Sequence, residues 1–440
     1  MDPVSLLRGV LGLALVTAAA YACSADRKRI NWRLVGVGIL LQCGFAFLVL
    51  KTGAGRAVFG FISRFFVWLF SFAAQGAQFV FGDLAKGPGT EGNMGFFFAF
   101  QILPTIIFFA SLMGVLYYLG IMQRVVQAIA WVMLRLMGTS GAESLDVAAN
   151  TFIGQTEAPL VIRPYIAKMT NSELFTIMTS GFAHIAGGVL AAYMQMLGLA
   201  WATAHGTPVD ASQATFAGHL LAASIMAGPA TMVVAKLLMP ETGDPLTMGT
   251  VRLEVERTDA NLLDAAASGA AAGVRLAINV AGMLIVFIAL IALVNSVLGF
   301  VGDWTGWNTA LAAAFGKPLS LELLFGLLFR FVAFGIGVPW ADSLQVGSLM
   351  GVKLAVNEFV AYMNMADLIA AGKLSGKAAV IATYALCGFA NFSSVAIQIG
   401  GISPLAESRR GDIARLGLRA LLGGTIATWM TASIAGILAD

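Results

Sequence analysis

The sequence predicts an all-α polytopic membrane protein with eight transmembrane helices, two re-entrant hairpins, interfacial helices and an inverted repeat. Of its 440 residues, 59% are hydrophobic and 11% are charged, whereas soluble domains carry about 25% charged residues. Several apolar runs are long enough to cross a hydrocarbon core of roughly 30 Å, which takes about 20 residues. Two segments that contain acids interrupt the apolar sequence at matching places in its two halves.

The eight longest apolar runs are the expected transmembrane helices. They cover residues 4–21, 35–50, 94–119, 173–200, 213–237, 275–300, 378–400 and 413–438. The first run could also be a signal peptide, but its basic cluster (Arg27, Lys28, Arg29 and Arg33) follows the run and does not precede it. This charge asymmetry favours an uncleaved helix that enters from outside. With the basic loops in the cytoplasm, we expect a multi-pass protein of a bacterial inner membrane with both termini outside.

Five further apolar segments are unlike simple spans. Residues 57–82, 121–138 and 319–336 carry charges within apolar sequence, as interfacial or packed horizontal helices do. Residues 141–170 and 339–366 are interrupted at their centres by polar residues. Proline and polar tips break the helical ladder there, which predicts re-entrant hairpins.

The order of these elements occurs twice along the chain. Residues 1–92 would form N-terminal scaffold helices and an interfacial helix, and 241–274 a cytoplasmic loop. Residues 93–240 and 275–440 each run as span, interfacial helix, hairpin and two spans, with the copies starting on opposite sides. Inverted repeats with discontinuous helices indicate a secondary transporter whose site lies near the midplane. The alternative is an ordinary membrane bundle with glycines at its helix crossings.

The most informative residue is Glu358, a carboxylate within strongly apolar sequence. A charge at membrane depth costs roughly 2.5–3.5 kcal/mol on insertion scales, so such residues usually face a cavity or a partner. The matching segment of the first half carries Glu157, which we also expect to be buried. Two clusters of acids and amides in matching places predict a polar substrate site.

Three motifs in this chain resemble those of the concentrative nucleoside transporters. They are Gly351-x-Lys353-x-x-x-Asn357-Glu358-Phe359, Gln155-Thr156-Glu157-Ala158-Pro159 and Phe389-Ala390-Asn391-Phe392-Ser393-Ser394. The resemblance extends from about residue 35 to 438. It implies a homotrimer in the lipid bilayer, in which each protomer moves a transport domain past a scaffold by an elevator-type mechanism. The implied function is import of nucleosides by cation symport.

The resemblance also implies a set of substrate-binding residues for pyrimidine or purine nucleosides. They are Gln155, Thr156, Glu157, Val189, Glu358, Phe389, Asn391 and Ser394. The first three would read the nucleobase, because an amide and a carboxylate offer both donors and acceptors. Glu358, Asn391 and Ser394 would hold the ribose, and the remaining two would be apolar walls. The alternative is that the asparagine and serines only satisfy an unwound backbone.

By the same resemblance, the coupling ion would be Na⁺. The matching positions are Asn150, Ile153, His184 and Ile185, of which the first offers an amide oxygen and the isoleucines offer carbonyls. His184 stands where sodium-coupled relatives carry a small hydroxyl residue. Histidine titrates near physiological pH, so H⁺ coupling is the alternative.

Other functional classes lack their sequence features. The histidines and cysteines have no metal-ligand or redox spacing, and no phosphate-binding loop is present, so we expect neither an enzyme nor a primary pump. A channel would line a continuous pore rather than concentrate polar groups at two tips. The net charge of +3 is small and dispersed, which predicts no nucleic-acid partner.

Overall fold

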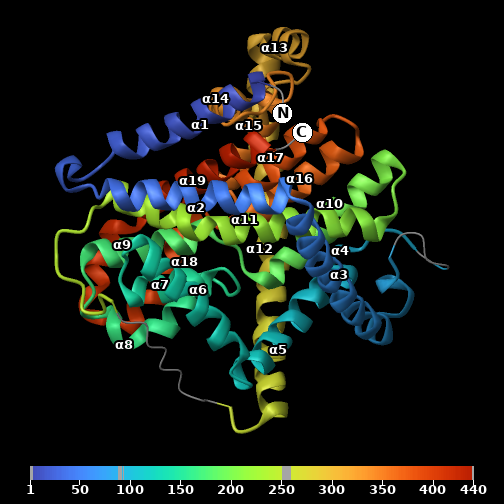
Figure 1. The fold of residues 1–440 in the computed structure, drawn as a ribbon. Coiled ribbons are helices and arrows are strands. Elements are labelled where there is room, and N and C mark those ends of the chain that lie inside the picture. Colours follow the sequence, from blue (N-terminus) through green and yellow to red (C-terminus); the bar gives the residue numbers. More distant parts are fainter. Residues whose placement is uncertain (1–2, 88–91, 93, 250–258, 439–440) are drawn as a thin grey trace.

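The computed structural model is all-helical over the residues that it describes, which are 3–87, 92, 94–249 and 259–438. In this part of the chain the only β-type pairing is an isolated bridge between Ser140 and Met248. The helices surround a continuous apolar core. The longest of them, α12 (Leu262–Thr305), runs upright through the middle of the view in Figure 1. The predicted all-α class is confirmed.

The helices differ widely in length. They are α1 (Pro3–Ala22), α2 (Trp32–Lys51), α3 (Gly53–Phe81), α4 (Phe98–Gln101), α5 (Leu103–Tyr118), α6 (Ile121–Met137), α7 (Gly141–Asn150), α8 (Arg163–Ile166), α9 (Asn171–Ala183), α10 (Gly187–His205), α11 (Val209–Leu238), α12 (Leu262–Thr305), α13 (Trp307–Phe315), α14 (Leu321–Gly335), α15 (Ser343–Ala355), α16 (Glu358–Ala370), α17 (Gly376–Leu386), α18 (Phe392–Ile402) and α19 (Arg410–Leu438). Short 3₁₀ turns join several of them.

Seven helical segments of the described chain are long and apolar enough to cross a membrane. They are α2, α3 with the turn after it, α4–α5, α9–α10, α11, α12 and the segment that ends in α19. Six of them coincide with predicted spans. The predicted span 4–21 coincides with α1, which has 20 residues and is apolar over Leu6–Ala22. The predicted span 378–400 is two shorter helices, because it is broken between α17 and α18. Conversely α3, predicted at 57–82 to be interfacial, has the length and apolarity of a span.

Both predicted re-entrant segments form pairs of short helices. In the first, α7 ends at Asn150, a turn follows, and the chain returns through Ala158–Ile162 into α8. In the second, α15 and α16 are separated only by Val356 and Asn357. The Asn357 side chain accepts a hydrogen bond from the Val360 N–H at 2.9 Å, so it caps α16 and fixes where that helix begins.

Two of the inner helices are interrupted, as the sequence predicts. The first interruption lies between α9 and α10, and the second between α17 and α18. Gly388, in the second, has a φ of +146°, and a Cβ there would lie 2.7 Å from the Phe182 carbonyl oxygen. Only glycine permits this close approach of the two interrupted helices.

The interrupted helices occupy the centre of the molecule. Helices α9, α10, α11 and α19 are almost entirely buried, whereas α3 and α12 expose most of their apolar side chains. Helix α12 packs closely on α5, where a Cβ at Gly269 would lie 2.6 Å from the Ala110 carbonyl oxygen. The outer helices therefore present an apolar surface suited to lipid or to other membrane helices.

The two ends of the chain lie on the same side of the molecule (Figure 1). Helix α1 runs antiparallel to α19, because Gly9 lies against Ile437 while the Cys23 carbonyl accepts a hydrogen bond from Arg419 at 2.7 Å. The side of the bilayer on which they lie remains a prediction.

The predicted domain limits agree only in part with the helix bounds. Helix α12 begins at Leu262, within the segment 241–274 that was expected to be a loop. Residues 250–258 of that segment lie outside the described chain. The order of a preceding helix, hairpin, interrupted helix and long helix recurs in both halves, and their division into inverted repeats remains a prediction.

Candidate substrate and ion sites

All eight predicted substrate-binding residues line one cavity of about 180 Å³. It lies between the tips of the two hairpins and the two helix interruptions, with one side formed by α12. Segments more than 200 residues apart in the chain therefore meet at one polar cavity. The residues that the sequence selects are Gln155, Thr156, Glu157, Val189, Glu358, Phe389, Asn391 and Ser394.

Glu358 is the first residue of α16 and is 5% exposed. One carboxylate oxygen accepts a hydrogen bond from the Tyr193 hydroxyl at 2.9 Å, and the other accepts one from the Asn391 amide at 3.2 Å. The positive end of the α16 dipole favours a negative charge at this position. Two donors and a helix N-terminus thus hold the carboxylate at the cavity wall, with oxygen lone pairs left for a ligand.

Asn391 both supports Glu358 and begins α18. Its side-chain oxygen accepts hydrogen bonds from the Ser394 N–H at 2.8 Å and the Ser393 hydroxyl at 2.7 Å. The asparagine therefore does satisfy unwound backbone, as the alternative interpretation has it, and it also contacts the buried acid. The Phe389 N–H donates to the His184 carbonyl at 3.2 Å, which joins this interruption to the one between α9 and α10.

The tip of the first hairpin contacts α18 directly. The Gln155 amide donates to the Ser394 hydroxyl at 3.2 Å, and its oxygen accepts from Gln398 at 3.1 Å. Thr156 lies against Gly401, because a Cβ built on Gly401 would lie 2.8 Å from the Thr156 methyl group. The two halves of the cavity are therefore bridged by the Gln155–Ser394 hydrogen bond, whose two side chains both line it, and Gln398 supports Gln155 from behind the wall.

Glu157 differs from its expected environment. Its side chain lines the cavity but is exposed, so the prediction of a second buried acid is wrong. It follows a turn at Gly154, and a Cβ there would lie 2.3 Å from a Glu157 carboxylate oxygen. The carboxylate therefore lies over Gly154 at the cavity wall, and the absence of a side chain at this glycine leaves room for it.

Several residues of the cavity and its support were missed by sequence reasoning. Tyr193 and Gln398 hold the acid and the amide, and α12 supplies an apolar wall. The wall residues are Leu276, Val280, Met283 and Leu284. Tyr193 and Gln398 are polar residues within apolar helices, and this feature could have indicated a role near the site. The α12 residues have no feature in the sequence that separates them from the rest of an apolar helix.

The predicted ion-site residues lie where the first hairpin meets the α9–α10 interruption. Asn150 ends α7, Ile153 is in the turn, His184 caps α9, and Ile185 follows it. The Gly187 N–H donates to the Phe152 carbonyl at 3.1 Å and so joins the two segments. The Asn150 side-chain oxygen is buried and has no hydrogen-bond partner in the part of the chain that the structure describes. An unpartnered buried oxygen beside two helix C-termini fits a hard monovalent cation.

His184 has one partner and one free ring nitrogen. Its Nδ1 lies 2.9 Å from the Ser180 carbonyl oxygen, which can only accept, so Nδ1 carries the hydrogen. Nε2 is buried and has no partner among the described residues. The ring is therefore oriented by α9 and leaves one nitrogen available.

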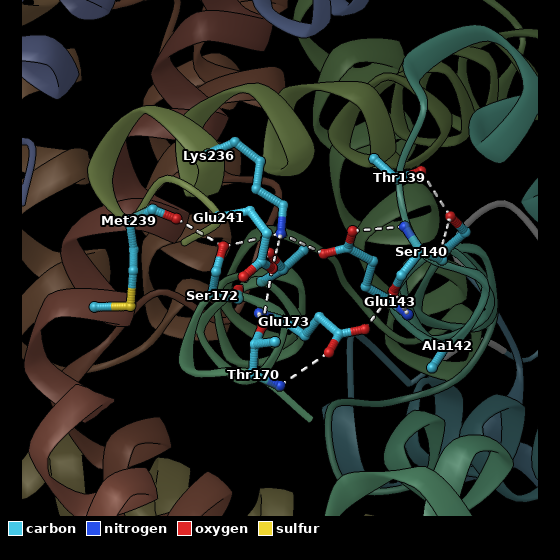
Figure 2. Close-up of polar contacts among 12 residues, drawn as sticks. Thr139, Ser140, Ala142, Glu143, Thr170, Ser172, Glu173, Lys236, Met239 and Glu241 are labelled. Atoms are coloured by element: carbon cyan, nitrogen blue, oxygen red, sulfur yellow. Dashed lines mark hydrogen bonds and ion pairs between the residues drawn. The ribbon is translucent and has the colours of Figure 1, made fainter. Parts of the chain in front are cut away.

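The first hairpin is anchored at the start of α7, away from its tip, by a buried ionic cluster (Figure 2). Lys236 of α11 forms an ion pair with Glu143 of α7 at 2.7 Å and donates to Ser172 of α9 at 2.9 Å. Glu173 accepts from the Ser140 hydroxyl at 2.5 Å. Glu143 also belongs to the N-terminal capping box of α7, and Glu173 to that of α9. The cluster therefore joins the starts of these two helices.

The signature lysine of the second hairpin has a similar anchoring position. Lys353 is buried in α15 and donates to the Ala385 carbonyl at 2.9 Å and the Thr428 hydroxyl at 3.3 Å. The carbonyl belongs to the last turn of α17, where the helix dipole favours a cation. This contact fixes the second hairpin beside the interruption that carries Phe389.

Comparisons with known proteins agree with this arrangement. Residues 219–436 match a family model described as "Na+ dependent nucleoside transporter C-terminus", residues 11–84 match the corresponding N-terminus, and residues 99–200 match a model described as "Nucleoside recognition". Together these models extend over most of the chain.

Individual relatives are similar over nearly the whole chain. An uncharacterized transporter of Bacillus subtilis, YutK, is 45% identical across 99% of this chain and 100% of its own length. Mouse solute carrier family 28 member 3 is 41% identical across 98% of this chain, which spans 58% of that longer protein. A structure of CNTnw in an inward-facing substrate-bound state has a TM-score of 0.86 and 42% identity, and covers 99% of this chain and 98% of its own.

Proposed function

The chain belongs to the concentrative, Na⁺-dependent nucleoside transporter family, whose members are membrane carriers and not enzymes, and we propose that it imports nucleosides together with Na⁺. The observation that carries the proposal is the environment of Glu358. This carboxylate is buried, held by two donors, and faces a cavity lined by all three sequence motifs. A site of this kind suits a polar ligand with several hydroxyl groups.

Glu358, Asn391 and Ser394 would bind the ribose. A carboxylate forms charge-assisted hydrogen bonds to hydroxyl groups, which are stronger than neutral ones. The two donors to Glu358 leave lone pairs on both of its oxygens, since each carboxylate oxygen accepts more than one bond. The buried, preoriented carboxylate supports selection for an intact ribose over a deoxyribose.

Gln155, Thr156 and Glu157 would read the nucleobase. The Gln155 amide already forms hydrogen bonds with Ser394 and Gln398, so it can exchange a protein partner for a base edge without loss of bonding. The exposed Glu157 carboxylate can accept from ring or exocyclic N–H groups. Val189 and Phe389 would pack against the base and sugar.

Na⁺ would bind between the first hairpin tip and the α9–α10 interruption. The unpartnered oxygen of Asn150 and the carbonyls of Ile153 and Ile185 are candidate ligands, because hard cations prefer oxygen. His184 offers no oxygen from its ring, and its free Nε2 keeps H⁺ symport as the second candidate.

Transport requires that the cavity open alternately to each side. The hairpin tips and interrupted helices would move together as a transport domain, because they are joined by the Phe389–His184 and Gly187–Phe152 backbone hydrogen bonds. Helix α12 would belong to the scaffold, and its exposed apolar face supports assembly of a homotrimer in the bilayer. The proposed location is the bacterial inner membrane, with both termini outside.

Uptake by proteoliposomes tests the proposed function. Labelled uridine should accumulate when an inward Na⁺ gradient is imposed at equal pH on both sides, and should only equilibrate without the gradient. A pH gradient alone should give no accumulation. Na⁺-independent accumulation that follows the pH gradient and is lost in His184→Ala would instead assign the coupling to H⁺.

A further inference from the structure

Asp146 is a fully buried acid with an incomplete set of partners. It lies in α7, one turn before Asn150, and is 0% exposed. One carboxylate oxygen accepts from the Asn150 amide at 3.0 Å, whereas the other has no partner among the described residues. No lysine or arginine in the described part of the chain forms an ion pair with it. By contrast Glu143, one turn earlier on the same helix, is paired with Lys236.

A buried carboxylate without a counter-charge is strongly unfavourable. Burial of an ion costs several kcal/mol unless a partner compensates it. Within a membrane protein such groups usually mark a path or site for ions. Either a bound proton or a cation that is not a side chain of the described chain must therefore compensate Asp146, and the unpartnered Asn150 oxygen one turn later favours the cation.

Asp146 also determines how Asn150 is oriented. The Asn150 amide nitrogen donates both to the Asp146 carboxylate at 3.0 Å and to the Asp146 main-chain carbonyl at 3.2 Å. Both acceptors bind the NH₂ end of the amide, so the Asn150 oxygen must point away from them. That oxygen is buried and unpartnered.

We propose that Asp146 is a positioning residue of the coupling-cation site, which supplies its negative charge and directs the Asn150 oxygen toward the ion. The inference rests on the proposed Na⁺ symport. Helix α7 ends at Asn150 and α9 ends before His184, so two negative dipole ends add to the carboxylate charge. Groups that orient a ligand in this way typically alter metal affinity about 10- to 100-fold when removed.

Binding of uridine by the full-length purified protein at a series of Na⁺ concentrations tests this role. In Asp146→Asn, the Na⁺ concentration that gives half of the maximal effect on uridine affinity should rise about 10- to 100-fold. The uridine Kd at saturating Na⁺ should stay within about twofold of wild type, because Asp146 does not line the cavity. Glu143→Gln is the matched control, since it removes a paired acid from the same helix and should leave the Na⁺ midpoint unchanged.

Thermal unfolding gives an independent readout with a defined sign. Without Na⁺, Asp146→Asn should melt above wild type, because the substitution removes an uncompensated buried charge. Added Na⁺ should raise the melting temperature of wild type much more than that of the variant. A merely structural aspartate would give the reverse order in Na⁺-free buffer. If Asp146→Asn does not fold, the same two measurements are made on Asp146→Ser, which also lacks the charge.

The possible results separate the two proposals. If wild-type uridine binding requires Na⁺ but Asp146→Asn keeps its Na⁺ midpoint, the role of Asp146 is refuted and Na⁺ symport stands. If wild-type binding ignores Na⁺ and is accompanied by proton uptake, measured as a heat that depends on the buffer, Na⁺ symport itself is refuted. A shifted Na⁺ midpoint together with the expected order of melting temperatures supports both.

Discussion

Replacement of Glu358 by glutamine tests the centre of the proposed substrate site. The substitution keeps the size of the side chain but removes its charge and converts one acceptor into a donor. Tyr193 and Asn391 both donate to this group, at 2.9 and 3.2 Å, so one of them would face another donor. The ribose would lose a charge-assisted hydrogen bond at the same time.

The size of the effect follows from these contacts. A hydrogen bond to a charged group contributes about 1.5–3 kcal/mol, compared with about 0.5–1.5 kcal/mol for a neutral one. If one bond between the ribose and the carboxylate is lost outright, uridine should bind about 10- to 100-fold more weakly, since a tenfold change corresponds to about 1.4 kcal/mol. Uptake at low uridine concentration should fall at least as far, because transport also requires closure around the ligand.

The assay compares uridine with 3′-deoxyuridine and 2′-deoxyuridine. In wild type, at least one deoxy analogue should bind more weakly than uridine, and Glu358→Gln should reduce or abolish that difference. Asp367→Asn is a suitable control, because this exposed acid lies on the same helix but does not line the cavity. Equal losses for uridine and both analogues in Glu358→Gln would refute the ribose assignment, as would uridine binding near wild type.

Three further substitutions probe the base contacts, the helix interruption and the hairpin anchor. Gln155→Ala should change relative affinities among bases, with losses of about 1–3 kcal/mol where a base edge is left unpaired; equal losses for all bases in a competition panel would argue against base reading. Gly388→Ala should abolish uptake, because its Cβ would lie 2.7 Å from the Phe182 carbonyl oxygen, and near-normal uptake would contradict this packing. Lys236→Met should lower stability by about 3–5 kcal/mol, since it leaves Glu143 buried and unpaired; Lys236→Met combined with Glu143→Met should recover part of the loss in thermal unfolding.

The hairpins and helix interruptions could be predicted because their sequence features are local. A polar tip, a glycine or an N-capping asparagine within an apolar run indicates a break wherever it occurs. Asn357 and Gly388 are such residues, and the breaks lie at both. The motifs at these breaks then selected residues that do line one cavity.

The rest of the site depends on contacts between distant segments, which periodicity cannot reveal. Helix α12 forms a cavity wall with apolar residues such as Met283, which resemble any lipid-facing residue in sequence. Asp146 is preceded on α7 by another acid, so it resembles part of a solvated helix start. Both acids are buried, and among the described residues Glu143 has an ion-pair partner whereas Asp146 has none. Glu157 was wrongly expected to be buried because an acid within apolar sequence does not reveal which side of the turn it faces.

The proposed ion and substrate sites share one short segment, and this arrangement provides a physical path for their coupling. The α9–α10 interruption contacts the hairpin tip through the Gly187–Phe152 hydrogen bond and the cavity through the Phe389–His184 hydrogen bond. A cation that orders this segment would therefore also fix Phe389 at the substrate cavity. Coupling between two ligands is reciprocal, so the nucleoside would raise cation affinity by the same factor. Because these hydrogen bonds use main-chain groups, the path does not depend on the histidine side chain, and coupling by Na⁺ is compatible with a histidine at position 184.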